Sequence, residues 1–318
     1  MAQELTLPDG RKLEYRITGS SDGFPLIYIH GTPGSYFVGS DVEAACARKG
    51  VKLITLNRAG YGGSSRQRGR TVVDIVPDLE ALLQHLGLKE CAVGGRSGGG
   101  EFEFLEQPSS PNFRFQTKRF ATGPHTLAAA ARLPGCRVAL CVCCVGPYQA
   151  EGLDFFAGFG EDNVQEFQAA LAGEEEVAKF TNKERPGLLA ADPAGLVKQL
   201  ASLLPEVDRK VVLESESVGE DFVQSFRESL KNGVDGWVDD DLAFTRPWGF
   251  EFDEIKVPVI VYHGDQDMMA PFAHGKWVVE HLPKEQVRPY LLQGEGHISI
   301  AHNYLDAMLD EVLAAAGQ

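Results

Sequence analysis

The chain has 318 residues, of which 43% are hydrophobic and 24% charged, and a chain of this length and composition can bury a full core. It carries 45 acidic against 30 basic residues, a net charge of −15, so nucleic acid and anionic membrane surfaces would repel it. No apolar run approaches the roughly 18 residues needed to span a bilayer, and the polar N-terminal segment is unlike an ordinary secretory signal. We therefore expect a cytoplasmic globular protein with no nucleic-acid partner and no membrane span.

The six cysteines do not form a disulfide or zinc pattern. Cys141, Cys143 and Cys144 lie in the β-branched apolar run of residues 137–146, where thiols act as small buried hydrophobic groups. Neighbouring residues of a strand point to opposite faces, so a local bridge is geometrically awkward. No pair has zinc-ligand spacing with histidines. The sequence therefore predicts reduced thiols and no metal site.

Strand-like and helix-like segments alternate along the first half of the chain. Residues 3–17 alternate apolar and polar residues around a Pro-Asp-Gly turn, which predicts a β-hairpin. Residues 72–87 carry helical spacing, and a helix is expected at 126–133. Continuous apolar runs typical of buried parallel strands occur at 25–30, 52–57, 91–95 and 137–146.

The strand rhythm stops between residues 151 and 254, where the chain becomes acidic and rich in helical patterns. It resumes at 257–264, with a helix near 273–282, a strand at 287–294 and a C-terminal helix. This order predicts an α/β fold with a mostly parallel central sheet. Its core would comprise residues 1–150 and 255–318, and residues 151–254 would form a helical cap. We expect the acidic runs at 173–177 and 239–241 to be solvated faces.

One short motif carries the chemistry. Gly95-Arg96-Ser97-Gly98-Gly99 fits Gly-x-Ser-x-Gly and follows a buried-type strand, where open α/β folds bind their ligands. A sharp strand-to-helix turn leaves no room for a Cβ atom two positions before or after the serine. Residues 19–23 fit the same pattern, but they lie in a polar turn with no helix after it. Ser97 is therefore the candidate nucleophile.

Four further motifs accompany Ser97 in the chain. They are "HGTPGS" (30–35), "NRAGYGGSS" (57–65), "HGDQDMMAP" (263–271) and "GEGHIS" (294–299). Together with the serine motif they resemble the α/β-hydrolase superfamily, in its serine-nucleophile, esterase- and lipase-like branch. Asn57 stands where that family usually has Asp. The resemblance covers almost the whole chain outside residues 101–122, and it implies the α/β-hydrolase fold with a helical lid.

The resemblance also implies roles for five residues. Ser97 Oγ would attack a carbonyl carbon, and His297 would take its proton and later pass it to the leaving group. Asp267 would fix the tautomer of His297. The backbone N–H groups of Thr32 and Gly98 would form the oxyanion hole.

The acid of this triad has alternatives. The family places the acid three residues after the strand-ending Gly264, which selects Asp267. Asp265 is the second candidate. Glu151 or Asp154, after the preceding strand, is the third.

Residues 101–122 interrupt the segment that follows Ser97. They hold five phenylalanines and two prolines, and they lack helical spacing. Without them the serine motif would run directly into the Ala-rich helix at 126–133. The segment does not favour a helix, whereas the expected fold places a helix directly after the serine. We consider two explanations: a retained intron translated in frame, or a genuine loop beside the nucleophile whose aromatic residues line an acyl pocket.

These observations predict a cofactor-free serine hydrolase that cleaves an ester or related acyl bond of a small, fairly apolar substrate. Perhydrolysis would use the same triad. The alternative is a non-catalytic or inactivated ligand-binding protein of the same fold, because the segment at 101–122 interrupts the helix behind the nucleophile.

Overall fold

The computed structural model describes residues 1–96, 123–215 and 217–318 of the chain. Its centre is an eight-stranded sheet with the order β1-β2-β4-β3-β5-β6-β7-β8. β2 runs antiparallel to both β1 and β4, and the other neighbouring strands are parallel. The strands are β1 (Gln3–Thr6), β2 (Lys12–Gly19), β3 (Phe24–Ile29), β4 (Val51–Leu56), β5 (Cys91–Arg96), β6 (Cys136–Val142), β7 (Val259–Gly264) and β8 (Val287–Leu292).

The predicted α/β-hydrolase fold, with its N-terminal hairpin and mostly parallel sheet, is confirmed. Each predicted strand is present within a few residues of its expected bounds, with one difference. β6 ends at Val142 instead of Gly146, and Cys143 follows it in a left-handed conformation with φ of 51°. Cys143 and Cys144 therefore lie beyond the strand, although all six cysteines are free and buried as expected.

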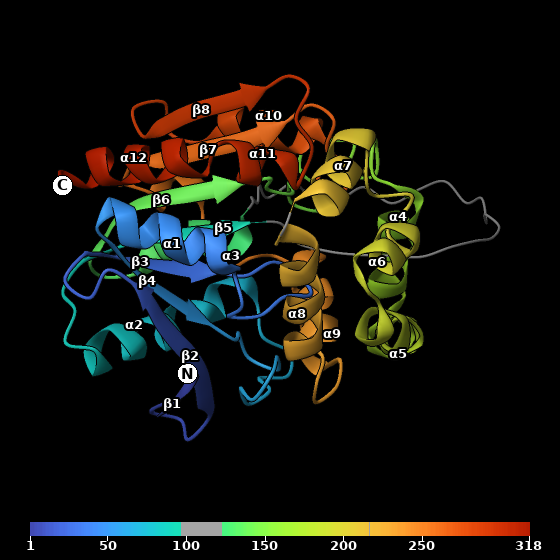
Figure 1. The fold of residues 1–318 in the computed structure, drawn as a ribbon, viewed down its shortest axis with the longest axis horizontal. Coiled ribbons are helices and arrows are strands. Elements are labelled where there is room, and N and C mark those ends of the chain that lie inside the picture. The colour runs from blue at the N-terminus through green and yellow to red at the C-terminus, as the bar shows by residue number, and fades with distance from the viewer. Residues whose placement is uncertain (97–122, 216) are drawn as a thin grey trace.

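Helices cover both faces of the sheet (Figure 1). α1 and α12 pack on one face and share a buried apolar cluster with it, whereas α2, α3 and α10 pack on the other. The predicted single C-terminal helix is two helices, α11 and α12, separated at Tyr304. The helices of the core are α1 (Ser40–Lys49), η1 (Val72–Asp74), α2 (Ile75–His85), α3 (Pro124–Arg132), η2 (Phe252–Glu254), α10 (Phe272–His281), α11 (Ser299–Asn303) and α12 (Leu305–Ala316).

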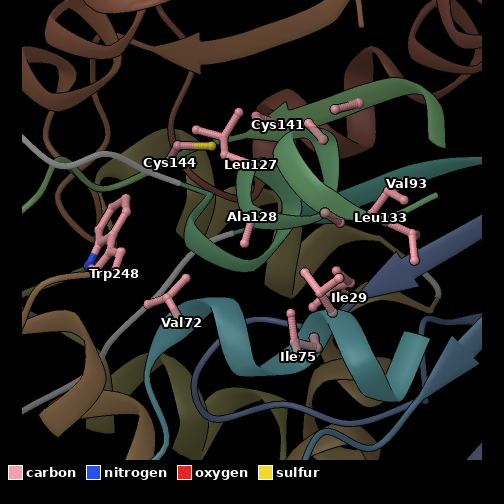
Figure 2. Close-up of a cluster of buried hydrophobic side chains, with 14 of the residues drawn as sticks. Ile29, Val72, Ile75, Val93, Leu127, Ala128, Leu133, Cys141, Cys144 and Trp248 are labelled. Atoms are coloured by element: carbon pink, nitrogen blue, oxygen red, sulfur yellow. The ribbon is translucent and has the colours of Figure 1, made fainter. Parts of the chain in front are cut away.

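α3 is the helix that packs behind the end of β5. Its Leu127 and Ala128 are fully buried, and Figure 2 shows them between the sheet and Val72. The run of small side chains lets α3 lie close against β5 and β6. The segment at 101–122, which precedes α3 in the chain, lies outside the described residues.

Among the described residues, six α-helices follow β6 and precede the short helix η2 and β7, and they form what we call the helical insertion. Figure 1 shows it beyond the carboxyl ends of the parallel strands. It has its own apolar cluster, which includes Trp237 and also Ile298 of the core. Its helices are α4 (Glu161–Ala172), α5 (Glu174–Ala190), α6 (Pro193–Gln199), α7 (Glu206–Glu214), α8 (Val218–Ser229) and α9 (Asp235–Phe244).

The two acidic runs of the insertion behave differently from each other. Glu175 and Glu176 are exposed, as expected for a solvated face. Asp239, Asp240 and Asp241 are buried, so the expectation of a solvated face is wrong for this run. α9 lies between other helices of the insertion and the core, and arginines of the core partner the first two of these carboxylates. Among the described residues no helix is long and apolar enough to cross a membrane.

Candidate active site

The loops after β7 and β8 bring two predicted site residues together. Asp267 follows β7 and His297 follows β8, and these strands are neighbours in the sheet. His297 Nδ1 lies 2.7 Å from Asp267 Oδ2, and both side chains are buried. The parallel sheet thus places an acid and an imidazole in hydrogen-bond contact at its carboxyl edge.

The surroundings of Asp267 keep its carboxylate charged. Its Oδ1 accepts hydrogen bonds from the backbone N–H groups of Met269 (2.8 Å) and Ala270 (2.7 Å). Burial acts to raise the pKa of Asp267, but the charge and hydrogen bond of His297 outweigh it and lower that pKa below its usual value. An ionised carboxylate only accepts, so Nδ1 of His297 carries the proton that it donates to Asp267, and of the two neutral tautomers this is the one that leaves Nε2 as an acceptor. Such a tautomer suits a general base.

The alternative acids lie elsewhere. Asp265 Oδ1 accepts from the backbone N–H of Gly294 at 2.8 Å and so ties the β7 loop to the β8 loop. Glu151 and Asp154 are exposed. Of the four candidate acids, Asp267 is the one that contacts His297.

Ser97 and Gly98 lie outside the described residues, since the described chain stops at Arg96, at the end of β5, and resumes at Gly123. A Cβ atom on Gly95 would lie 2.4 Å from Thr126 Oγ1, so the glycine two positions before Ser97 is required by α3. The Arg96 guanidinium lies over the ring of Phe222 in α8, 4.9 Å from the ring centre. The residue before Ser97 thus faces the helical insertion.

The loop of residues 30–35, which we call the Thr32 loop, follows β3 and is held from several sides. His30 Nδ1 donates to its neighbour Gly31 O at 2.7 Å, and His30 Nε2 accepts the backbone N–H of Arg58 at 3.0 Å. His30 therefore shapes this loop. The Thr32 hydroxyl donates to Asp240 Oδ2 at 2.6 Å and accepts from Arg58 Nη2 at 3.0 Å.

One cavity of about 580 Å³ connects these parts. Its wall includes the Thr32 loop, Arg96 and His297, together with apolar side chains of the insertion such as Phe222 and Phe226. Volumes of this size hold small organic ligands, and mostly apolar walls with a few polar groups are typical of such sites. One part of the cavity lies at the carboxyl ends of the strands, where the sequence predicts the chemistry, and the rest extends toward α1 and α12, where Arg48, Leu53 and Met308 line it.

Sequence reasoning missed two carboxylates of the insertion that reach these loops. Asp208 in α7 accepts the backbone N–H groups of His297 (2.8 Å), Ile298 (3.0 Å) and Ser299 (2.8 Å). Asp240 in α9 holds Thr32, as described above. Neither lies in a motif, and both come from a part of the chain far from the loops they bind.

Within the described part of the chain, one group of side chains has the geometry of a metal site. The ligand atoms of Cys143, Asp267 and His297 lie within 4.8 Å of one another. The group includes the hydrogen-bonded Asp267–His297 pair, so an ion there would displace that bond. Burial raises the pKa of the Cys143 thiol well above its usual value, with Asp267 adding to the rise, and this opposes the thiolate that a metal needs. The prediction of no metal and no cofactor stays a prediction.

Comparison with known proteins finds similarity to proteins of the α/β-hydrolase fold. Residues 25–102 match the family model described as "alpha/beta hydrolase fold". The chain is 36% identical over 97 residues to a proline iminopeptidase of Lactobacillus helveticus, covering 29% of this chain and 33% of that protein. It is 22% identical over 278 residues to the AB hydrolase superfamily protein YisY of Bacillus subtilis, covering 86% and 85%. The matches to the first curated relatives span between 30% and 35% of those proteins' lengths.

A solved structure agrees over the whole chain. It is a thermophilic esterase from Thermogutta terrifontis, with a TM-score of 0.64, 16% identity and coverage of 100% of both chains. At this identity the likeness establishes the fold alone.

Proposed function

We propose that the chain, which has the α/β-hydrolase fold and matches that family's model over residues 25–102, is a serine hydrolase that cleaves an ester or related acyl bond of a small, fairly apolar substrate. The observation that carries the proposal is the buried 2.7 Å contact between Asp267 and His297 in loops that face the same cavity as the Thr32 loop. Ser97, the residue after Arg96, is the proposed nucleophile. The mostly apolar wall of the cavity supports an apolar substrate.

The proposed chemistry follows the protonation state of the pair. Nε2 of His297 takes the proton of the Ser97 hydroxyl as Oγ attacks the carbonyl carbon. Asp267 stays ionised and stabilises the imidazolium. The backbone N–H groups of Thr32 and Gly98 stabilise the oxyanion, and each such donor contributes about 10²–10³-fold to the rate. His297 then gives the proton to the leaving alcohol, and water hydrolyses the acyl-enzyme with the same groups.

A second candidate is an inactivated or non-catalytic member of the fold. The observation that favours it is that the family model matches up to residue 102, within two residues of where the 101–122 segment begins. The match and the expected interruption thus meet at the same point of the chain. Displacing the turn at Ser97 by about an ångström would lower the rate about 10²-fold.

Covalent labelling tests the nucleophile directly. A fluorophosphonate probe forms a bond between Ser97 Oγ and phosphorus and releases fluoride. We expect the full chain to be labelled at Ser97, which peptide mass spectrometry identifies, and Ser97→Ala and His297→Ala to lose the label. Labelling that survives Ser97→Ala would contradict the assignment of the nucleophile. A folded full chain that takes up no label would favour the non-catalytic alternative.

A further inference from the structure

Two buried carboxylates of the helical insertion reach the two loops that carry the proposed machinery. The Thr32 loop comprises residues 30–35, and we call residues 293–298 the His297 loop. Asp240 contacts the first and Asp208 the second, and neither carboxylate is exposed to solvent. The two loops belong to the core, so both contacts cross from insertion to core.

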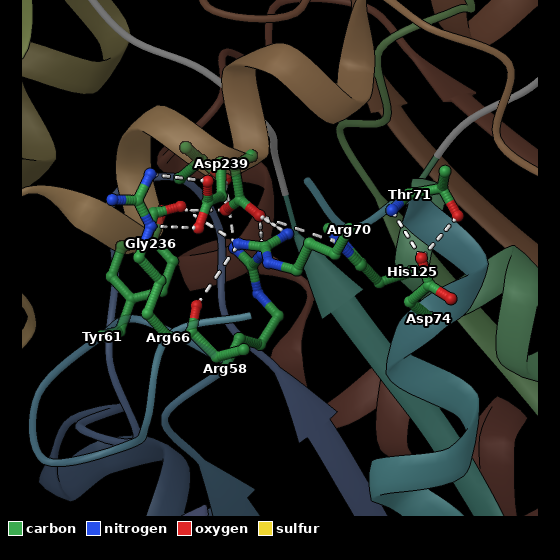
Figure 3. Close-up of polar contacts among 12 residues, drawn as sticks. Arg58, Tyr61, Arg66, Arg70, Thr71, Asp74, His125, Gly236 and Asp239 are labelled. Atoms are coloured by element: carbon green, nitrogen blue, oxygen red, sulfur yellow. Dashed lines mark hydrogen bonds and ion pairs between the residues drawn. The ribbon is translucent and has the colours of Figure 1, made fainter. Parts of the chain in front are cut away.

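Asp240 is the centre of a charged network around the Thr32 loop. Its Oδ1 contacts Nη1 of Arg58 at 2.5 Å and Nη1 of Arg70 at 2.6 Å. Its Oδ2 accepts the hydroxyl groups of Thr32 at 2.6 Å and Tyr61 at 2.7 Å. Figure 3 shows Arg58, Tyr61 and Arg70 converging beneath α9. Although burial acts to raise the pKa of Asp240, the two arginines hold it well below its usual range, so the network stays charged.

Arg58 extends the network into the loop backbone. Its Nη2 donates to Gly31 O at 2.9 Å and to Thr32 Oγ1 at 3.0 Å. The insertion comes close enough for this because glycines face each other at the contact: a Cβ on Gly60 would lie 2.6 Å from the backbone N of Gly236 at the start of α9. The position of Thr32 therefore depends on the seating of α9.

Asp208 holds the His297 loop through its backbone. Its two oxygens accept three consecutive N–H groups, from residues 297 to 299, at the point where α11 begins. A Cβ on Gly296 would lie 2.4 Å from Asp208 Oδ2, so the glycine before His297 leaves room for this carboxylate. The backbone of His297 is thus fixed from α7, independently of the side-chain bond to Asp267.

We propose that Asp208 and Asp240 are positioning residues, through which the seated helical insertion holds the His297 loop and the Thr32 loop in working geometry. The inference rests on the function proposed above, because it assigns the loops their catalytic purpose. An insertion that moves away from the core would release both loops together. The insertion then holds the active-site loops in place as well as covering the cavity. Of two substrates that bind equally tightly, the one that presses the insertion onto the core would have the higher kcat.

The test uses full-length variants chosen to break one contact each. Thr32→Val removes the hydroxyl that links the Thr32 loop to Asp240 but keeps the buried ion pairs and the backbone N–H. Asp208→Asn keeps one acceptor oxygen and turns the other into a donor. Asp78→Asn is the matched control, because Asp78 is a buried carboxylate of α2 whose ion pair with Arg11, at 2.9 Å between Arg11 Nη1 and Asp78 Oδ2, lies within the core, outside both loops and the insertion. Thr32→Ser keeps the hydroxyl and serves as the rescue.

Hydrogen exchange of peptides over 28–36 and 293–300 is the first readout, because it reports the loops whether or not the chain is active. We expect Thr32→Val to speed exchange about tenfold in the first peptide only, Asp208→Asn in the second only, and Asp78→Asn and Thr32→Ser in neither. Unchanged exchange in both test variants would overturn the proposal. Equal loosening of both loops by Asp78→Asn would overturn it too, since the effect would then be general destabilisation.

Ester hydrolysis is the second readout. Loops that are held less firmly lower kcat, by about 10–100-fold for displacements near an ångström, and leave KM nearly unchanged. A rise in KM at constant kcat would contradict a positioning role. If the wild-type chain shows no turnover that depends on Ser97, the proposed function fails, and the exchange experiment still decides whether these carboxylates hold the two loops.

Discussion

Asp265 and Asp267 lie two residues apart in one loop, but they contact different parts of the molecule. Asp267 is buried against His297, whereas Asp265 binds the backbone of Gly294. The sequence motif ranks Asp267 above Asp265 but cannot decide which of them contacts the histidine. That contact depends on the loop after β8, where His297 lies 30 residues later in the chain. The contact between the loops after β7 and β8 therefore identifies the acid, which the spacing within the β7 loop alone leaves open.

Replacing each aspartate by asparagine tests this difference. Asp267→Asn keeps the shape but presents an amide to Nδ1, so the imidazole loses its favoured tautomer and its charge partner. We expect kcat for a p-nitrophenyl ester to fall by about 10²–10⁴-fold, the usual share of general-base catalysis. Asp265→Asn should retain most of the activity. A larger loss in Asp265→Asn than in Asp267→Asn would reverse the assignment.

The sequence missed Asp208 and Asp240 for a physical reason. Both act through tertiary contacts with residues far along the chain: 89 residues separate Asp208 from His297, and 208 separate Asp240 from Thr32. No local spacing reports such a pairing. The second glycine of the "GEGHIS" motif, Gly296, is the one local sign of the contact with Asp208, because a side chain at this position would collide with that carboxylate.

Among the elements, α9 departs furthest from its sequence pattern. A run of three aspartates is typical of a solvated face, yet the helix is buried from Gly236 to Phe244. The compensating arginines lie between residues 58 and 70, so the charge balance becomes visible only once the chain is folded. Apolar strands and α3, by contrast, were predictable because their burial follows from their own composition.

Asp241 in α9 gives this element a pH-dependent stability. Burial raises the pKa of Asp241 well above its usual range, and nearby Glu166 adds to the rise. The folded chain therefore binds more protons here than the unfolded chain, so this residue lowers stability as pH rises above the unfolded value of about 3.9. Asp241→Asn cannot ionise. We expect its Tm, measured by calorimetry relative to wild type, to gain between pH 4 and pH 8, by about 2–4 °C for each kcal/mol involved.

The exposed Asp306→Asn, whose partner Arg48 is also exposed, is the control for that comparison and should show a nearly constant difference. A Tm difference for Asp241→Asn that falls as pH rises would mean that the carboxylate is charged and partnered in the folded chain.

At the scale of the whole molecule, the α/β core and the helical insertion could be predicted from the alternation of strands and helices and from its loss between residues 151 and 254. The division of the chain into a core and a cap domain at those residues stays a prediction. The family model matches residues 25–102, and α3 begins at Pro124, so the two parts of the expected nucleophile turn stand on either side of the 101–122 segment. The retained-intron hypothesis addresses this segment, and sequencing the transcript across it tests that origin.

Whether the molecule works as a hydrolase is measured most directly with p-nitrophenyl acetate and two purified chains, the full 318 residues and a version that lacks Glu101–Thr122. Ser97→Ala in each background is the blank. The proposed triad predicts turnover that depends on Ser97 in at least the shortened chain, because there the turn runs directly into α3. Turnover by the full chain as well would make the phenylalanines of the segment candidates for the substrate pocket. The absence of Ser97-dependent turnover from both folded chains would contradict the proposed function.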